Sequence, residues 1–381
     1  MLLCGDMISQ VLKSLFRTPI LRGFLFMLVV SCGNQSASVT VKNDVLEIAD
    51  SSVTNVSTNQ TILHYFDSLA VKGKFNGVAL FSKIAELTEL SEGFRIKSKG
   101  DSLLLDDQFQ LASLSKPITA FGLLYLVNEG KIELDNPVVS YLWDFPYPDI
   151  TVRSLLNHTS GMGNYIYVTD SLWNNPDSFM SNRDMYNILR CEQVPTYYQP
   201  FKRFNYCNTN YALIPVLIEE VSGLTFSDFM RMNIFEPLGM LSTFYYDPAY
   251  VQEYDVLGHY PDGSTKKPFY LDAIIGDKSL YSSVHDLYKF YEEVKHPTLV
   301  SKSLLDQSMS IEAKTGSNSY YGLGWRIRPM DDSDTLIYHN GWWRGFRSYF
   351  WMSKNSDKVA IILTNSIRGG YLNQKEIWNL F

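Results

Sequence analysis

The pattern of hydrophobic and polar residues divides the chain into a strand-forming part, a helical part and a second strand-forming part. Residues 76–81 form an almost unbroken apolar run, which indicates a buried strand, and residues 92–97 and 109–111 are predicted to join it in a sheet. An amphipathic segment at residues 62–69 predicts a helix before this sheet. The first part of the fold is therefore expected to be a helix packed on a sheet.

Residues from 115 to about 245 have mainly helical patterns. The stretch after Lys116 is apolar on all sides, which is typical of a central buried helix, and Glu129-Gly130 offers a glycine to end it. Because proline is accepted only in the first turn of a helix, Pro117 requires this helix to begin close to Ser113. The serine is thereby predicted to lie at the positive end of the helix dipole.

Strand patterns return after Gly276, and a last helical segment begins at Asn373. The strands of this part are predicted at residues 321–327, 335–339, 346–352 and 358–364. Sheet-forming sequence thus brackets a helical insertion. We expect an α+β fold in which an antiparallel sheet flanked by helices meets a mainly helical lobe, about residues 115–275, with a cleft between them.

The N-terminus has the features of an export signal. Lys13, Arg17 and Arg22 precede an apolar run at residues 23–30 that is too short to cross a bilayer as a folded helix. Residues 1–31 are therefore predicted to be a signal peptide.

The end of this segment, Val29-Val-Ser-Cys32, resembles the lipobox of bacterial lipoproteins, in which the cysteine is lipidated. The alternative is a plain signal peptide in which Cys32 is incidental. We expect a lipoprotein anchored to a membrane and facing the periplasm or the surface of a bacterial cell. Residues 32–58, rich in Ser, Thr and Asn, would be a flexible tether, and residues 59–381 the folded domain.

Composition excludes several classes of partner and cofactor. The formal net charge is −7, and Lys and Arg do not cluster outside the N-terminus, which argues against a nucleic-acid surface. The cysteines and histidines show no metal-ligand spacing, so we expect neither a metal nor an organic cofactor.

The first candidate for chemistry is Ser113-Leu-Ser-Lys116. A lysine three residues after a serine places an amine and a hydroxyl on one helix face, and such an amine activates a serine without a histidine. The pattern alone is weak, because a second copy, Ser264-Thr-Lys-Lys267, occurs in a polar turn.

A second candidate is Tyr206-Cys-Asn208. A phenol beside a lysine exchanges protons with a serine, and a carboxamide holds a substrate amide. Tyr371-Leu-Asn373 repeats this tripeptide in the C-terminal helical segment, where we expect packing and not catalysis.

A third candidate is His339-Asn-Gly341, which lies at a predicted strand, where a glycine allows close approach to the backbone. Lys314-Thr-Gly316 competes with it, but it lies in a stretch predicted to be a loop.

Together, these motifs resemble those of the serine β-lactamase-related superfamily, which includes class C β-lactamases, D,D-carboxypeptidases, D-aminopeptidases and related esterases. Framing motifs in the same order support the resemblance: Leu155-Leu-Asn-His-Thr-Ser-Gly161, Pro237-Leu-Gly-Met240, residues 276–287 and Tyr321-Gly-Leu-Gly-Trp325. The resemblance covers about residues 60–381 and implies a β-lactamase/transpeptidase-like fold.

The resemblance also implies a role for each residue of the site. Ser113 would be the nucleophile, Lys116 its base or electrostatic partner, and Tyr206 a proton carrier. The substrate-binding residues would be Asn208, His339, Gly341 and Trp342, and the N–H groups of Ser113 and Trp342 would form the oxyanion hole. Whether Lys116 or Tyr206 takes the proton stays open.

The predicted activity is hydrolysis of an ester or amide through a covalent acyl-enzyme, by an esterase, a D-amino-acid peptidase or a β-lactamase-like enzyme. The substrate would be a small molecule or derived from peptidoglycan. His339 in place of a lysine leads away from dedicated β-lactamases, because a neutral imidazole attracts a carboxylate less. Arg344 and Arg347 would meet a substrate carboxylate or lie on a solvated strand face. The alternative function is a β-lactam or peptidoglycan sensor that acylates without turnover, and the sequence leaves the oligomeric state open.

Overall fold

The computed structural model describes residues 53–381, apart from residues 174, 176, 250–255 and 331–333. The predicted signal peptide, Cys32 and most of the predicted tether lie outside the described residues. Helix α1 (Val53–Val71) begins inside the segment that the sequence assigned to the tether. In the part of the chain that is described, none of the helices combines the length and the apolar character that crossing a bilayer requires.

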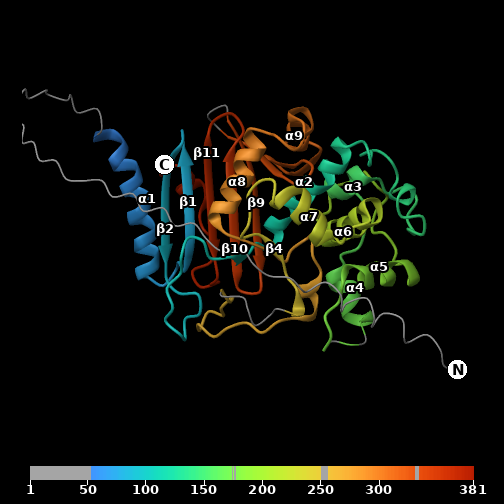
Figure 1. Ribbon diagram of the computed structural model, residues 1–381, viewed down its shortest axis with the longest axis horizontal. Coiled ribbons are helices and arrows are strands. Elements are labelled where there is room, and N and C mark those ends of the chain that lie inside the picture. Colours follow the sequence, from blue (N-terminus) through green and yellow to red (C-terminus); the bar gives the residue numbers. More distant parts are fainter. Residues whose placement is uncertain (1–52, 174, 176, 250–255, 331–333) are drawn as a thin grey trace, which may run out of the picture. The chain divides into compact units, whose positions relative to one another are not determined.

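The larger sheet of the described chain is antiparallel and has its strands in the spatial order β2-β1-β11-β10-β9-β8-β7-β6 (Figure 1). Its strands are β1 (Gly77–Lys83), β2 (Glu86–Glu92), β6 (Ala313–Gly316), β7 (Ser319–Tyr321), β8 (Arg326–Pro329), β9 (Thr335–Trp343), β10 (Phe346–Ser353) and β11 (Lys358–Thr364). N-terminal and C-terminal segments therefore meet in one sheet, where β1 pairs with β11.

Helices cover both faces of this sheet. On one face lie α1 and α10 (Gln374–Trp378), and the Phe66 ring of α1 packs 5.5 Å from the Phe81 ring of β1. On the other face lies α8 (Val284–Lys295), whose Phe290 ring is 6.3 Å from the Phe350 ring of β10. Because both faces are covered, the central strands are apolar along their length instead of alternating.

The helical lobe is built around α2 (Ser115–Asn128), which is buried on nearly every side. The helix begins directly after a 3₁₀ turn at Ala112–Leu114, so Pro117 lies in its first turn as predicted. Its end at Gly130, which has φ +68°, also agrees with the prediction. Helix α2 packs against α6 (Asn208–Ser222), which also contacts α3 (Val152–Leu156), α4 (Tyr165–Leu172), α5 (Asn182–Cys191) and α7 (Phe226–Met230), and α9 (Lys302–Ser308) follows α8.

Two strand predictions in the first part were wrong. Residues 109–111 do not join the large sheet, because β3 (Phe109–Gln110) pairs with β5 (Leu280–Ser282) in a separate sheet that also contains β4 (Phe244–Tyr245). Residues 93–97 are not a strand, and Glu92 is the last residue of β2, since β1 turns back earlier than predicted. The turn between the two strands has Ile84 and Ala85 at φ 52° and 62°, a hairpin conformation that glycine or asparagine usually adopts. Because neither residue is glycine or asparagine, the sequence gives no signal of this turn.

Candidate active site

Ser113 lies in the tight turn that leads from β3 into α2. Ala112, directly before it, has φ +51°, a conformation that is uncommon for a residue with a Cβ atom. Strand β9 presses against this turn, because a Cβ atom at Gly341 would lie 2.0 Å from the Leu111 carbonyl oxygen and 3.1 Å from the Ala112 Cβ. The hydroxyl of Ser348 on β10 donates a hydrogen bond to the same carbonyl. Glycine is therefore required at position 341 for strand and serine turn to meet.

The amine of Lys116 lies at the serine, as the spacing along the helix predicts. Lys116 Nζ donates to Ser113 Oγ at 3.1 Å and to the backbone carbonyl of Asp277 at 2.7 Å. Lys116 is fully buried, while Ser113 is partly exposed. The amine is thus shielded from water, and the serine hydroxyl stays within reach of a substrate.

Tyr206 and Asn208 lie at the start of α6, and the ring of Tyr206 approaches the amine of Lys116. The Tyr206 ring centroid is 5.1 Å from Lys116 Nζ and 4.4 Å from the buried ring of His158. Asn208 is the first residue of α6, and its Oδ1 is buried without a hydrogen-bond partner among the described residues. The structure therefore brings the phenol ring to the amine and leaves a buried acceptor on the neighbouring carboxamide.

His339 is fully buried and engaged through both ring nitrogens. Nδ1 lies 2.9 Å from the Asn340 carbonyl oxygen and must donate to it, so the neutral ring accepts at Nε2 from the Tyr321 hydroxyl at 3.1 Å. Burial holds the pKa of His339 well below its usual value, and the positive charges of Arg326 and Lys116 lower it further. This position of the site is therefore uncharged at neutral pH.

The end of β9 provides a backbone donor beside the serine turn. The two-residue turn at Arg344 and Gly345 makes Trp343 and Phe346 the closing pair of the hairpin. Hydrogen bonding alternates along an antiparallel pair, so the N–H of Trp342 points away from β10. On that side β8 pairs with β9 only as far as Tyr338, and no strand of the described chain covers residues 339–343. The Trp342 N–H therefore faces an open strand edge.

The side chain of Trp342 projects from the opposite face to Gly341 and is 57% exposed. The same alternation places Arg347, its cross-strand partner, on that far face, where its guanidinium donates to the carbonyls of Ile367 and Gly370. Arg344 donates to the carbonyl of Lys267. Both arginines are thus engaged within the protein, and Arg347 faces away from Ser113.

The competing copies of the three motifs, at residues 314–316, 264–267 and 371–373, do not take part in this cluster. Lys314 lies on β6, separated from β9 by β7 and β8, although its segment forms a strand where a loop was predicted. Ser264 lies in an exposed turn, where its hydroxyl bonds to Asp262 at 2.7 Å. Tyr371 is 62% exposed and packs against the guanidinium of Arg347.

Comparison with known proteins identifies the family of the chain. The profile of the Beta-lactamase family matches residues 62–375. The chain belongs to the Beta-lactamase family. It is accordingly a serine hydrolase of the β-lactamase-related superfamily.

The chain is similar to one curated relative and two solved structures in particular. The chain is 31% identical over 317 residues to Penicillin-binding protein 4* of Bacillus subtilis, an alignment that covers 79% of this chain and 70% of the relative. A crystal structure of a penicillin-binding protein from Bacillus halodurans has the same fold, with a TM-score of 0.73 at 24% identity over 83% of this chain and 97% of that one. A D-amino acid amidase from Ochrobactrum anthropi superposes with a TM-score of 0.69 at 25% identity, over 85% and 96% of the two chains.

Sequence reasoning did not identify Arg326 as part of this Beta-lactamase-family site. Its guanidinium carbon lies 5.1 Å from the ring centroid of Tyr206 and 5.8 Å from that of Tyr321. The residue follows directly on the predicted motif at residues 321–325, which was the available signal. The predicted strand at residues 321–327 is in fact two strands, and the turn between them brings Arg326 to the site.

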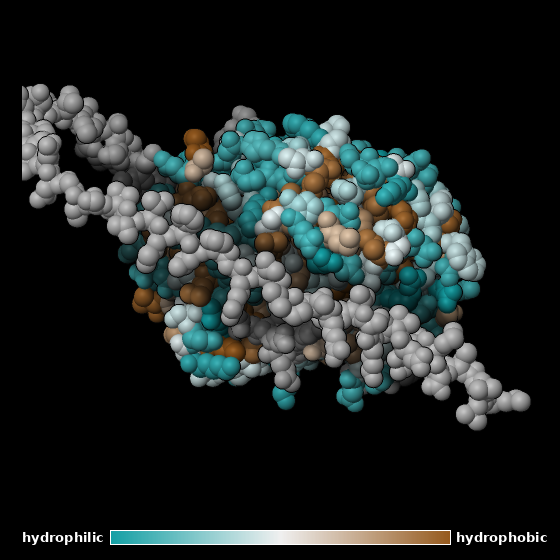
Figure 2. Space-filling model, in the orientation of Figure 1, coloured by the Kyte–Doolittle hydropathy of each residue, from teal (hydrophilic) through white to brown (hydrophobic). Residues whose placement is uncertain are grey.

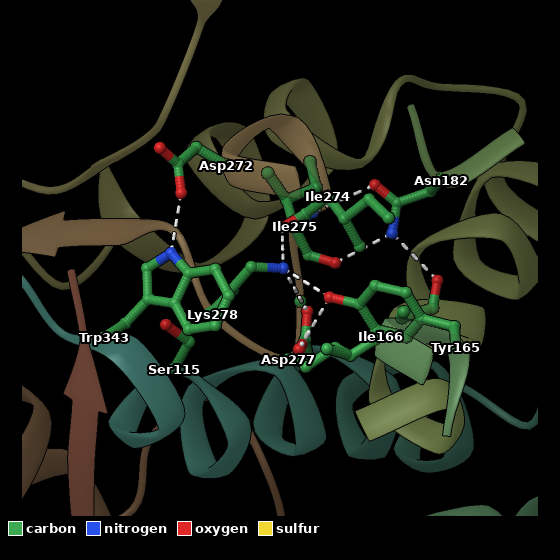
Figure 3. A network of polar contacts seen from close by, with 12 residues as sticks. Ser115, Tyr165, Ile166, Asn182, Asp272, Ile274, Ile275, Asp277, Lys278 and Trp343 are labelled. Atoms are coloured by element: carbon green, nitrogen blue, oxygen red, sulfur yellow. Dashed lines mark hydrogen bonds and ion pairs between the residues drawn. The ribbon is translucent and has the colours of Figure 1, made fainter. Parts of the chain in front are cut away.

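A second buried lysine lies one residue beyond the carbonyl that holds Lys116 (Figure 3). Lys278 Nζ donates to the Tyr165 hydroxyl, to the Ile274 carbonyl at 3.3 Å and to Asp277 Oδ1 at 3.4 Å. The Tyr165 hydroxyl in turn donates to Asp277 Oδ2 at 3.1 Å. Burial lowers the pKa of Lys278. Burial raises the pKa of Tyr165, and the Asp277 carboxylate raises that pKa further. This polar network is closed within the protein.

The network also reaches strand β9. Trp343 projects from the same face as Gly341, and its indole N–H donates to Asp272 Oδ1 at 2.6 Å. Lys278 Nζ lies 5.2 Å from the centroid of the same ring (Figure 3). The residues that hold Lys116 and the strand that carries the Trp342 N–H are thereby packed against each other.

Proposed function

We propose that this chain hydrolyses an ester or amide through a covalent acyl-enzyme on Ser113. The observation that carries the proposal is the 3.1 Å contact between Lys116 Nζ and Ser113 Oγ, made at a partly exposed serine by a fully buried amine. In such a pair the amine, or the neighbouring phenol of Tyr206, accepts the serine proton as Oγ attacks the carbonyl carbon.

The tetrahedral intermediate places a negative charge on the former carbonyl oxygen. The N–H groups of Ser113 and Trp342 would donate to that oxygen, and an oxyanion donor of this kind is worth about 3–4 kcal/mol. Collapse breaks the bond to the leaving group, which takes its proton from Tyr206 or Lys116. A water molecule then attacks the acyl-enzyme, and the same groups carry the proton in the opposite direction.

Two features support an acyl donor that contains an amide. Asn208 Oδ1 is a buried acceptor without a partner among the described residues, and a substrate N–H would satisfy it. The names of two similar proteins, a penicillin-binding protein and a D-amino acid amidase, point in the same direction. We propose a small-molecule or peptidoglycan-derived substrate. Export and lipid attachment at Cys32 remain predictions from the sequence.

A fluorophosphonate probe tests the nucleophile, because it phosphonylates an activated serine irrespective of the natural substrate. The wild type should be labelled, Ser113→Ala should lose labelling, and the matched control Ser264→Ala should keep it. Labelling of the Ser113→Ala variant would refute the proposal. Turnover of p-nitrophenyl esters, D-Ala-D-Ala peptides and nitrocefin then ranks the substrate classes, and a single burst without turnover on all three would favour the sensor.

A further inference from the structure

His158 is a fully buried residue of the helical lobe whose backbone adopts an uncommon conformation. It follows helix α3 and has φ +60°, a value that histidine adopts more often than most residues but that still costs free energy. Its carbonyl oxygen accepts a hydrogen bond from the N–H of Asn205 at 2.9 Å. The backbone of His158 therefore holds the segment that leads directly to Tyr206.

The imidazole of His158 holds the same segment through its Nδ1 atom. Nδ1 lies 3.2 Å from the backbone nitrogen of Cys207 and 3.2 Å from Asn210 Nδ2. The Oδ1 atom of Asn210 accepts from the Ser160 hydroxyl at 2.6 Å, so the amide group of Asn210 turns its Nδ2 toward the ring. Because both neighbours of Nδ1 are donors, Nδ1 accepts from both and the ring proton is on Nε2.

The surroundings of the ring keep it in this neutral form. Burial lowers the pKa of His158 well below its usual value, and the positive charges of Lys116 and Arg326 lower it further. The ring centroids of Tyr206 and Tyr321 lie 4.4 and 4.9 Å from that of the imidazole. Nδ1 therefore stays an acceptor at neutral pH, and the imidazole also packs against the phenol ring of the site.

The hydrogen bond to Nδ1 is made at the point where the position of Tyr206 is fixed. Cys207 lies between Tyr206 and Asn208 and is the N-cap of α6, so the helix itself offers no acceptor for its N–H. The peptide group is planar, and the Cα atom of Tyr206 lies in the same plane as the N–H of Cys207. An acceptor that holds this N–H thereby holds the backbone from which the phenol projects.

We propose that His158 is a positioning residue that holds the phenol of Tyr206 at Lys116 by accepting the Cys207 N–H at Nδ1. The inference rests on the proposed function, in which Tyr206 or Lys116 exchanges the proton of Ser113. His158 itself touches neither the substrate nor the proton. A displacement of about 1 Å in a catalytic group lowers a rate by about 100-fold, so the loss of this one acceptor should be visible in the acylation rate.

Two substitutions separate the acceptor from the ring. His158→Asn keeps the acceptor, because the Oδ1 of asparagine occupies nearly the position of Nδ1, and asparagine also adopts positive φ readily. His158→Phe keeps an aromatic ring and loses the acceptor. The rate of fluorophosphonate labelling at Ser113 should fall about 10- to 100-fold in His158→Phe and less than about 5-fold in His158→Asn.

His259→Phe is the matched control. His259 is also fully buried, and its Nε2 accepts from the backbone N–H of Lys97 at 3.1 Å, but it holds no residue of the site. This variant should be labelled at the rate of the wild type. All rates are compared for protein that unfolds cooperatively in urea and is fully folded without it.

The pH profile of labelling distinguishes a displaced phenol from a protein that is only less stable. The rate rises with pH as the proton acceptor of Ser113 loses its own proton. A smaller folded fraction scales this curve without moving its midpoint. A displaced Tyr206 changes the contact between the phenol and the ammonium of Lys116, so the midpoint should move by at least about 0.5 pH unit in His158→Phe and stay in place in His158→Asn.

A loss in His158→Asn as large as in His158→Phe, or no loss in either, would overturn the inference, because the acceptor would then not decide the rate. If His158→Phe does not fold, the tautomer of the wild type decides. In ¹⁵N NMR of histidine-labelled protein, the His158 signals, assigned by their absence from His158→Asn, should show a neutral ring protonated at Nε2, and a proton on Nδ1 would overturn the inference. If the wild type itself is not labelled at Ser113, the proposed function fails and the inference falls with it, whereas a labelled wild type with an equally labelled His158→Phe contradicts the inference alone.

Discussion

Asp277 contacts two fully buried lysines, Lys116 and Lys278, whose hydrogen-bond partners differ. Lys116 donates to the backbone carbonyl of Asp277, and Lys278 lies against its carboxylate. Removing an ammonium group from water costs several kcal/mol in either place. The hydrogen-bond partners of each amine decide whether the buried lysine has a structural or a catalytic role.

All partners of Lys278 are protein groups with no access to a substrate: the Tyr165 hydroxyl, the Ile274 carbonyl and the Asp277 carboxylate. One partner of Lys116 is the hydroxyl of Ser113, which is partly exposed. Burial and an altered environment therefore do not by themselves distinguish a catalytic lysine from a structural one. The distinction lies in whether one hydrogen bond of the amine ends on an accessible nucleophile.

The most direct test of this difference is to replace each lysine with methionine. Lys116→Met should reduce the rate of fluorophosphonate labelling by about 10⁴-fold, because the serine loses its proton acceptor or electrostatic partner. Lys278→Met should reduce that rate less than about 10-fold, since Lys278 makes no hydrogen bond to Ser113 or to Lys116. If folded Lys278→Met lost labelling as completely as Lys116→Met, Lys278 would belong to the proton-transfer machinery.

When stability is measured by urea unfolding, we expect Lys278→Met to have the larger effect and Lys116→Met the smaller one. Lys278→Met leaves the buried Asp277 carboxylate without its cation and should cost about 3–5 kcal/mol. Adding Asp277→Asn should recover most of this loss, since no unpaired charge then remains. Lys289→Met removes a half-exposed partner of Asp286 and should cost less than about 1 kcal/mol. A loss in the double variant as large as in Lys278→Met would show that packing, not charge, sets the stability.

The sequence predicted the parts of this arrangement that local geometry controls. The contact of Ser113 with Lys116 follows from the helix period, and Pro117 placed the helix start. The approach of Tyr206 and of residues 339–341 was available only through family resemblance, because these segments are distant along the chain. Their proximity depends on how α6 and β9 pack against α2.

The contacts that sequence could not supply are those that tertiary packing alone creates. Tyr165 and Lys278 are 113 residues apart, and neither has a pattern that predicts the other. The carbonyl of Asp277 is a backbone group, so residue identity does not mark it as the second acceptor of Lys116. In the sequence, Arg326 does not differ from a solvent-exposed strand residue, because only the tertiary structure places its guanidinium over the ring of Tyr206.

A last difference between the two lysine sites is the pair of buried histidines on the Lys116 side. Burial lowers the pKa of His158 and His339 well below 6.5, and the charges of Lys116 and Arg326 add to this in both. Between pH 6.5 and these lowered values the unfolded chain binds protons that the folded chain does not. Stability is therefore fully present above pH 6.5 and falls as the pH drops below it, by up to about 1.4 kcal/mol per pH unit for each histidine.

His339→Gln isolates one of these contributions. Between pH 7 and 5.5, the unfolding free energy of the variant should fall by about 1 kcal/mol less than that of the wild type, because glutamine does not titrate. His259 and His285 titrate in both proteins, so their contributions cancel in the difference. The lowered pKa of His259 acts in the same direction as that of His339, and the pKa of His285, which lies beside Glu89 and Asp106, is raised and acts in the opposite direction. An unchanged acid loss in His339→Gln would mean that His339 accepts a proton in the folded protein, and His158 would then be the only one of the two histidines left to distinguish the Lys116 side from the Lys278 side in acid.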